Sequence, residues 1–341
     1  MGDTHESITE LLDRGVRERV FPGAVWAIGD RDGVREWGTC GVADPAVPGS
    51  LMRRDTIFDI ASLTKIVAVW AVIGGLWEEE RLPLDVPLDG FWPEVAGHPM
   101  GNVTVRHLLT HTAGLPLRAN LRNQYGTDPG AIRAGVLHEK PHDLPGRAVK
   151  YTDRAALVLG YLAEHVSGRP LDRLAHERVW QPLGMNHTRF GPLPSELAAD
   201  CAPTELDQDT GTHLKGIAHD FSARLLGGVC GIAGVFSVLD DLALFQRHLL
   251  DPAAHTSFGL AWVTESLQVH TGSLTPSRGL FWHPAPGSDD TYVHYGFTGT
   301  GMWTSPKRER WGVLLTNKLY YSRDRDPLMA IRDTFCRLAL G

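Results

Sequence analysis

The chain has 341 residues, of which 43% are hydrophobic, enough for one large or two small domains with a packed core. Its formal net charge of −7 disfavours nucleic acid as a partner, because Lys and Arg are not in excess to neutralise phosphates. The four cysteines lie far apart without a C-x-x-C spacing, so neither a zinc site nor a disulfide framework is indicated.

The first residues are acidic and lead into an amphipathic helix that we expect over Ile8–Arg19. They contain no basic stretch followed by an apolar run, so we predict no signal peptide and a cytoplasmic location. No segment approaches the roughly 18 consecutive apolar residues that cross a bilayer, so we expect no membrane partner.

Strand patterns occupy both ends of the chain, and helical patterns occupy its middle. We expect strands over 23–28, 34–38, 279–283, 302–305 and 311–315, and helices over 62–80, 105–111, 155–167, 171–180, 240–249 and 327–340. This order predicts an α+β fold. Residues 1–60 and 245–341 would form an α/β subdomain, and residues 61–244 an inserted all-helical subdomain.

The tetrad SLTK at 62–65 lies where a short apolar strand turns into the long helix. A serine hydroxyl is a weak nucleophile at neutral pH and needs a basic group beside it. On a helix, residues three apart share a face, so Lys65 can place its amine next to the Ser62 hydroxyl. Ser62 would also lie at a helix N-terminus, where free backbone N–H groups can stabilise an oxyanion.

Two further motifs follow in an order that supports this chemistry, YTD at 151–153 and HYG at 294–296. Together with HLLTHTAGL at 107–115, PLGM at 182–185, APTE at 202–205 and GFTGT at 296–300, the pattern resembles the class C β-lactamase and penicillin-binding-protein superfamily of serine hydrolases. The resemblance extends from about residue 20 to about residue 335. It implies a β-lactamase/transpeptidase-like fold, with an antiparallel sheet flanked by helices and the catalytic cleft at the border of the helical subdomain.

The resemblance also implies catalytic roles. Ser62 would be the nucleophile, Lys65 would work partly deprotonated, and Tyr151 would share the proton transfer between the serine and the leaving group. The backbone N–H groups of Ser62 and Phe297 would form the oxyanion hole, and Gly296 would let its strand approach the substrate closely.

Three positions depart from the β-lactamase pattern. Asp153 replaces a common Asn and, when ionised, cannot donate to a substrate carbonyl; it would either belong to the cleft or cap the helix that begins near Ala155. His294 stands where β-lactamases usually carry Lys and is largely neutral at pH 7, which favours uncharged esters or amides over carboxylates. Ile232 replaces a His common in near relatives, and we expect it to shape the pocket without a catalytic role.

HEKPH at 138–142 matches the zinc-protease motif formally, but Pro141 cannot continue a helix that would place both histidines on one face. We therefore predict no metal and no cofactor. The aromatic residues Trp262, Trp282 and Trp303, with the loop from Arg118 to Thr127, suggest an aromatic-lined cleft.

The predicted function is that of a serine hydrolase acting on a small-molecule ester or amide, in the manner of a carboxylesterase. An acyltransferase that passes the acyl group to an amine or alcohol in small-molecule biosynthesis is the alternative, and β-lactam hydrolysis is disfavoured. A relative that binds ligands without catalysis is a further reading, which the intact set of Ser62, Lys65 and Tyr151 opposes.

Overall fold

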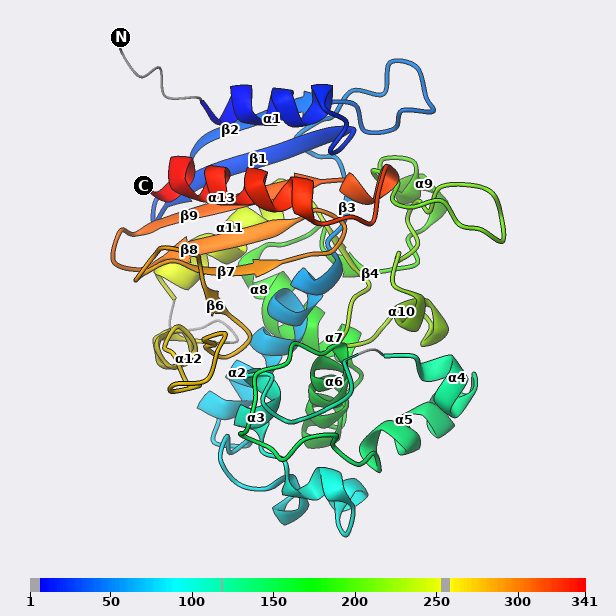
Figure 1. The fold of residues 1–341 in the computed structure, drawn as a ribbon, viewed down its shortest axis with the longest axis vertical. Helices are drawn as coiled ribbons and strands as arrows, with labels where there is room; N and C mark the ends of the chain where they lie inside the picture. The colour runs from blue at the N-terminus through cyan, green and yellow to red at the C-terminus, as the bar shows by residue number, and fades with distance from the viewer. Residues whose placement is uncertain (1–6, 118, 253–257) are drawn as a thin grey trace.

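A computed structural model describes residues 7–117, 119–252 and 258–341 (Figure 1). The strands are β1 (Gly23–Asp30), β2 (Gly33–Gly41), β3 (Phe58–Asp59), β4 (Arg189–Phe190), β5 (Val235–Ser237), β6 (His283–Pro284), β7 (Tyr292–Tyr295), β8 (Gly301–Ser305) and β9 (Arg310–Thr316). The α-helices are α1 (Ile8–Arg17), α2 (Ala71–Glu78), α3 (Val105–Leu109), α4 (Leu121–Tyr125), α5 (Pro129–Leu137), α6 (Asp153–Ser167), α7 (Leu171–Ala175), α8 (Gln181–Leu183), α9 (Ser195–Ala198), α10 (Phe221–Leu225), α11 (Leu239–Leu250), α12 (Leu260–Ser266) and α13 (Asp326–Leu340).

The main sheet joins the two ends of the chain. Its strand order is β2-β1-β9-β8-β7-β6, and every neighbouring pair is antiparallel. Strand β1 near the N-terminus pairs with β9 near the C-terminus, with Trp26 opposite Leu314. The segments 1–60 and 245–341, which we expected to form one subdomain, therefore share this sheet.

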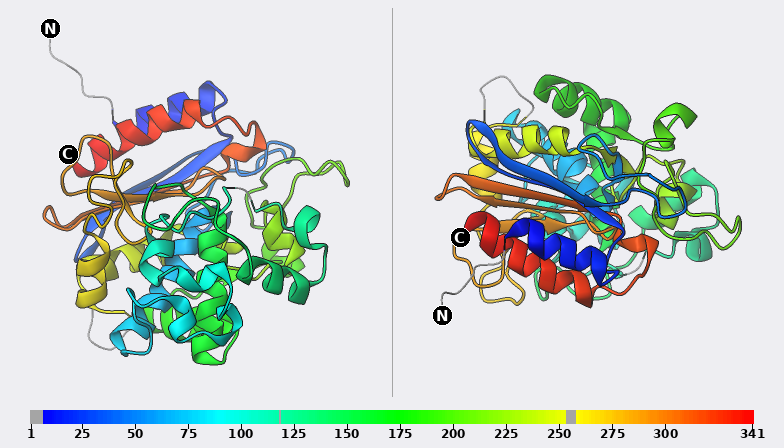
Figure 2. Two further views of the ribbon diagram at one scale, coloured as in Figure 1. Left: turned by 60° about the horizontal axis from the view of Figure 1, so that its bottom comes forward. Right: turned by 90° about the horizontal axis from the view of Figure 1, so that it is seen from above.

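Helices cover both faces of the sheet. Helices α1 and α13 lie side by side on one face, while α11 and the helical part of the chain lie on the other (Figure 2). Helix α1 begins with a capping box in which the Ser7 side chain accepts from the N–H of Glu10 and the Glu10 carboxylate accepts from the N–H of Ser7. Its apolar face packs Leu11 and Leu12 into a cluster with Phe335 of α13.

The long central helix, expected over 62–80, is divided into three parts. A 3₁₀ turn over Ala61–Leu63 is followed by a π-helical segment over Lys65–Trp70 and then by α2. The window Ala61–Glu78 has a mean hydropathy of 1.3, sufficient by length and composition for a membrane helix, and 83% of it is buried inside the protein. Such burial is typical of a core helix.

Two expectations about the C-terminal third are wrong. The strand expected over 279–283 is reduced to β6, because Phe281 has a φ of 64°, outside the extended region. Trp262, Trp282 and Trp303 line no cleft, since all three side chains are fully buried. Trp262 and Trp282 pack against Trp70, and Trp303 packs against Phe335.

The inserted segment 61–244 is mainly helical but also contributes β4 and β5, which join β3 in a small second sheet of order β3-β5-β4. This sheet ends immediately before the turn that carries Ser62. Arg118, the first residue of the loop expected to line the cleft, is outside the described residues, and α4 lies within the remainder of that loop.

Candidate active site

Ser62 lies in a tightly held turn between β3 and the central helix. Ala61, directly before it, has a left-handed φ of 50°, which costs a non-glycine residue about 1 kcal/mol or more. The buried Asp59 stabilises this conformation by accepting a hydrogen bond from the Ala61 N–H at 2.8 Å. The Thr298 hydroxyl donates to the Asp59 carbonyl at 2.7 Å and the Thr300 hydroxyl to the Ile60 carbonyl at 3.1 Å, which ties the turn to the loop between β7 and β8.

Lys65 is fully buried, and its ammonium group has a partner for each of its three N–H bonds. Nζ lies 3.0 Å from Ser62 Oγ, 2.7 Å from the Ile232 carbonyl and 2.8 Å from Asp153 Oδ1. Burial by itself would lower the pKa of Lys65, but the Asp153 carboxylate and Tyr151 raise it, and the net direction is upward. The expectation of a partly deprotonated Lys65 is therefore wrong, because a paired carboxylate favours the charged form.

Asp153 belongs to the cleft and does not cap helix α6. The cap is Thr152, whose hydroxyl accepts the Arg154 N–H at 3.1 Å, whereas Asp153 begins the helix and pairs with Lys65. Of the two roles left open for Asp153, the capping role is excluded.

Tyr151 is 38% exposed and stands at the mouth of the site. Lys65 Nζ lies 5.5 Å from the centre of its ring, and the ring packs against His111 at 4.6 Å and His294 at 6.3 Å between centroids. His111 belongs to the HLLTHTAGL segment, for which the sequence predicts a structural role without metal binding. Its Nδ1 accepts from the Thr152 N–H at 3.4 Å, and it therefore helps to place the residue after Tyr151.

His294 is buried on β7. Its Nδ1 lies 2.8 Å from the Phe281 carbonyl, which can only accept, so the proton is assigned to Nδ1 and Nε2 carries a lone pair. Burial, followed by the neighbouring Lys65 charge, places the pKa of His294 well below its ordinary value. The imidazole is neutral at pH 7, as expected.

Gly296 and Phe297 form the turn that faces Ser62. A Cβ at Gly296 would meet Thr300 Oγ1 at 2.0 Å and the Ile60 carbonyl oxygen at 2.5 Å, so the close approach of this strand requires glycine. The ring of Phe297 is surrounded by Arg323, Arg325 and Lys318, whose charged groups lie 4.6–5.4 Å from its centroid. The Ile232 side chain is buried, and the position contributes its carbonyl to Lys65 instead of shaping a pocket.

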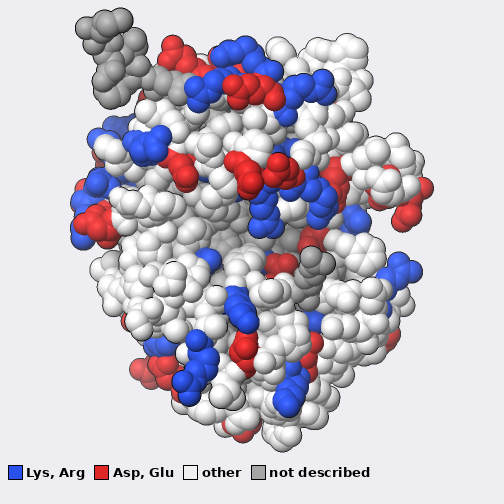
Figure 3. Space-filling model, in the orientation of Figure 1, with Lys and Arg blue, Asp and Glu red and all other residues white. Residues whose placement is uncertain are grey.

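Two adjoining cavities open at Ser62 and share the lining residues Tyr151, Phe297 and Arg325. Figure 3 shows the hollow in this face, between the sheet part above and the helical part below, with basic side chains at its upper margin. The first cavity, here the basic cavity, is also lined by Arg278, His283, His294, Lys318 and Arg332, and by no acidic residue.

The cations of the basic cavity lack counter-ions. Within the described ranges, none of Arg278, Lys318, Arg325 and Arg332 forms an ion pair with an acidic side chain. Arg332 donates only to carbonyl and sulfur acceptors, and Lys318 Nζ has no hydrogen-bond partner. Burial lowers the pKa of Arg332 to about 10, and burial with the neighbouring arginines lowers the pKa of Lys318 to about 8.

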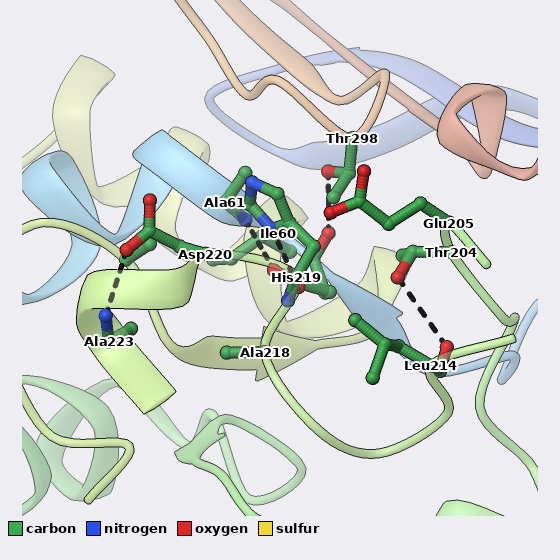
Figure 4. A network of polar contacts seen from close by, with 12 residues as sticks. Ile60, Ala61, Thr204, Glu205, Leu214, Ala218, His219, Asp220, Ala223 and Thr298 are labelled. Atoms are coloured by element: carbon green, nitrogen blue, oxygen red, sulfur yellow. Dashed lines mark hydrogen bonds and ion pairs between the residues drawn. The ribbon is translucent and has the colours of Figure 1, made fainter. Parts of the chain in front are cut away.

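The second cavity, here the mixed cavity, carries both signs of charge. Its further lining includes Asp153, Glu205, His219, Asp220, Arg224 and Arg323. Figure 4 shows His219 near Ala61, with Asp220 and Glu205 on either side in this view. Sequence reasoning missed His219 and Asp59 because they are 160 residues apart and neither belongs to a motif.

No group of three or more His, Cys, Asp or Glu side chains suited to a metal occurs in the described part of the chain. Helix α5 ends at Leu137, so the HEKPH residues 138–142 follow it in a loop. The expectation that this motif does not form one continuous helix face is thus confirmed.

Comparison with known proteins gives one consistent result. The family model described as Beta-lactamase matches residues 8–334. The "Putative D-alanyl-D-alanine carboxypeptidase" of Escherichia coli strain K12 is 29% identical over 313 residues, covering 77% of this chain and 69% of that protein.

Among solved structures, "EstCE1, a hydrolase with promiscuous acyltransferase activity" superimposes with a TM-score of 0.77 at 22% identity, covering 98% of this chain and 97% of that one. A class C β-lactamase from Rhodobacter sphaeroides superimposes with a TM-score of 0.76 at 17% identity, covering 97% and 99%. The predicted β-lactamase/transpeptidase-like fold is confirmed.

Proposed function

We propose that this chain, which belongs to the Beta-lactamase family, forms an acyl-enzyme on Ser62 from a small-molecule ester or amide and hydrolyses it. The observation that supports this most directly is the 3.0 Å hydrogen bond from Lys65 Nζ to Ser62 Oγ, in a turn that opens onto two cavities. A serine that is restrained by its own turn and stabilised by a buried cation meets the requirements for a nucleophile.

The chemistry follows from the positions of the groups. Ser62 Oγ attacks the carbonyl carbon and its proton moves to the Tyr151 phenol oxygen, while the Lys65 ammonium stabilises the negative charge that develops on Oγ. Tyr151, exposed beside them, passes a proton to the leaving group. The backbone N–H groups of Ser62 and Phe297 hold the oxyanion, a contribution of about 3–4 kcal/mol in acyl transfer.

The substrate carries an anionic group. Buried cations are normally paired, yet Lys318 and Arg332 are buried in the wall of this cavity without an acidic partner among the described residues. The more exposed Arg278 and Arg325 add to the same positive charge, which lacks a counter-charge until a ligand supplies one. A carboxylate or phosphate on the ester would do so. This differs from the preference for uncharged substrates drawn from His294, because other residues provide the positive charge.

Acyl transfer to an amine or alcohol is the second candidate. The mixed cavity supports it, since it gives an acceptor a polar route to Ser62 separate from the basic cavity. β-Lactam hydrolysis remains disfavoured, because Asp153 replaces the common Asn and pairs with Lys65 instead of donating to a substrate carbonyl. A cytoplasmic location and the lack of a cofactor remain predictions.

The test is a comparison of wild type, Ser62→Ala and the exposed control Ser195→Ala with two p-nitrophenyl esters, acetate and hemisuccinate. We expect a Ser62-dependent acyl adduct by intact mass, an unchanged Ser195→Ala variant, and a higher kcat/KM for the hemisuccinate. Added amine separates the two candidates, because preferential amide formation indicates a transferase. Ester turnover that survives in Ser62→Ala would refute the proposal.

A further inference from the structure

The deacylation step needs a proton acceptor that Lys65 does not provide. All three N–H bonds of its ammonium are engaged, and Asp153 and Tyr151 favour its charged form despite burial. A water or alcohol that attacks the acyl-enzyme must lose a proton as its oxygen bonds to the carbonyl carbon. Another group beside Ser62 must therefore receive that proton.

His219 has the geometry of such an acceptor. Its Nδ1 lies 2.9 Å from Asp59 Oδ2, and the same carboxylate oxygen accepts the His219 backbone N–H at 2.8 Å. A carboxylate only accepts, so the proton of neutral His219 is assigned to Nδ1 and the lone pair to Nε2. A buried aspartate that orients a histidine in this tautomer is the arrangement found in serine hydrolase triads.

His219 forms part of the wall of the mixed cavity. His219 and Ser62 both line this cavity, and the His219 ring stacks on Phe297 with 5.9 Å between centroids. Among the described residues Nε2 makes no hydrogen bond, and it is not sealed from solvent as Nε2 of His111 and His294 is. An acceptor molecule in the cavity can therefore contact both the acyl carbon on Ser62 and His219.

The other three histidines near Ser62 are poor proton acceptors, and burial lowers the pKa of one of them, His283, to about 4. Burial places the pKa values of His111 and His294 well below the ordinary value, and neither Nε2 is accessible. For His219, burial alone would lower the pKa, but the Asp59 carboxylate raises it, and the net direction is upward. Of these four histidines, only His219 has a pKa raised above the ordinary histidine value.

We propose that His219, oriented by Asp59, is the general base that activates the water or alcohol releasing the acyl group from Ser62. This inference rests on the proposed acyl-enzyme. The acceptor O–H bond breaks, its proton moves to Nε2, and the oxygen bonds to the acyl carbon. The bond from that carbon to Ser62 Oγ then breaks, and Oγ takes a proton from the Lys65 ammonium. His219 releases its proton to solvent and Lys65 regains one, so protons balance over the cycle.

Charged groups on several elements surround His219 and determine the direction of its pH dependence. Asp59 from β3, Asp220 and Glu205 raise its pKa. Arg224 of α10 donates to the His219 carbonyl, and Asp153, Arg323 and Arg325 line the same cavity. Because the base acts in its neutral form, the deacylation rate should rise with pH through a pKa above the ordinary histidine value. If His219 only supported the turn at Ala61, the deacylation rate would not rise with pH in this way.

The experiment measures acylation and deacylation separately in wild type, His219→Asn and the matched control His98→Asn. The burst of p-nitrophenol from the hemisuccinate ester gives the acylation rate, and intact protein mass follows the acyl adduct as it is lost. We expect His219→Asn to keep its burst rate within twofold, to deacylate about 100-fold more slowly and to accumulate the Ser62 adduct. The rise of the deacylation rate with pH should also disappear in this variant. Hydroxylamine, a nucleophile that needs no base, should release the acyl group from wild type and variant at similar rates.

Each other outcome has a distinct meaning. Equal losses of acylation and deacylation, or an unchanged deacylation rate, would overturn the role of His219. If wild type forms no acyl adduct, the proposed function itself fails, and the burst experiment shows this before any variant is examined. Should His219→Asn misfold, the pH profile of wild-type deacylation and His219→Gln test the same point, and a flat profile counts against it.

Discussion

Lys65 Nζ and Asp153 Oδ1 lie 2.8 Å apart, with the lysine side chain fully buried and the aspartate side chain 30% exposed. The pair joins the central helix to the start of α6 and holds Lys65 as a cation beside Ser62. Where a β-lactamase commonly has an amide that contacts substrate, this chain has a counter-ion for Lys65. The substitution therefore favours the charged form of the lysine beside Ser62.

Asp153→Asn should destabilise the protein by about 2 kcal/mol, less than for a fully enclosed pair because Asp153 is partly exposed. Without the carboxylate, burial dominates and the pKa of Lys65 falls, so the loss of acylation rate at alkaline pH should move to lower pH. Urea unfolding and burst kinetics from pH 6 to 10 measure both effects. The control is Asp143→Asn, which breaks the exposed pair with Lys150 and should cost less than about 1 kcal/mol. If the acylation rate of Asp153→Asn fell at the same alkaline pH as that of wild type, Asp153 would not set the charge of Lys65.

Thr152→Val tests the support beneath Tyr151. The Thr152 hydroxyl accepts from the Arg154 N–H and donates to the Pro116 carbonyl, so an isosteric valine leaves both groups without a partner. We expect a loss of about 2 kcal/mol in the free energy of unfolding, with the acylation rate reduced more than substrate affinity, because Tyr151 loses its fixed position. Thermal unfolding and single-turnover kinetics measure the two. Unchanged kinetics would mean that His111 and the chain around it position Tyr151 without this cap.

Sequence reasoning brought together the residues that are close along the chain or belong to a motif. Ser62 and Lys65 were placed correctly because a spacing of three holds one face even though the segment is 3₁₀ and π-helical instead of α-helical. The two halves of the main sheet followed from strand patterns at both ends. What it missed depends on tertiary contacts, as with His219 and Asp59, which meet only when β3 and the segment before α10 converge.

The two wrong assignments near the C-terminus both concern apolar and aromatic residues, and they meet at Phe281 and Trp282. Apolar and aromatic residues over 279–283 are typical of a strand, but Phe281 turns out of the extended region so that its N–H donates to the Leu109 carbonyl and its own carbonyl meets His294. Trp282 then enters the core. The hydrophobic character of these residues correctly predicts that they are buried. It does not distinguish a ring in the core from a ring in the wall of a cleft.

Gly296→Ala should abolish most activity while leaving a folded protein. The added Cβ would collide with Thr300 Oγ1 and the Ile60 carbonyl, which forces the turn of Phe297 away from Ser62. Overpacking of this kind costs about 1–3 kcal/mol in stability, and displacement of an oxyanion donor costs about 100-fold in kcat. Thermal unfolding and ester kinetics test this against Gly130→Ala in the exposed first turn of α5, which should be nearly neutral. Full activity in Gly296→Ala would show that the turn does not contribute to the oxyanion hole.

Lys318→Met tests the unpaired charge of the basic cavity through both stability and binding. The pKa of Lys318 is lowered from 10.5 to about 8, first by burial and then by the neighbouring arginines. Between these values the unfolded chain binds more protons than the folded one, so wild-type stability should rise with pH across that window. Lys318→Met should lack this rise, and it should raise KM for the hemisuccinate ester about tenfold while changing KM for the acetate less than twofold. Denaturation from pH 7 to 10.5 and ester kinetics provide both readings, with the exposed Lys307→Met as control. Equal changes in KM for the two esters would show that Lys318 supports the fold of the cavity and does not recognise an anion.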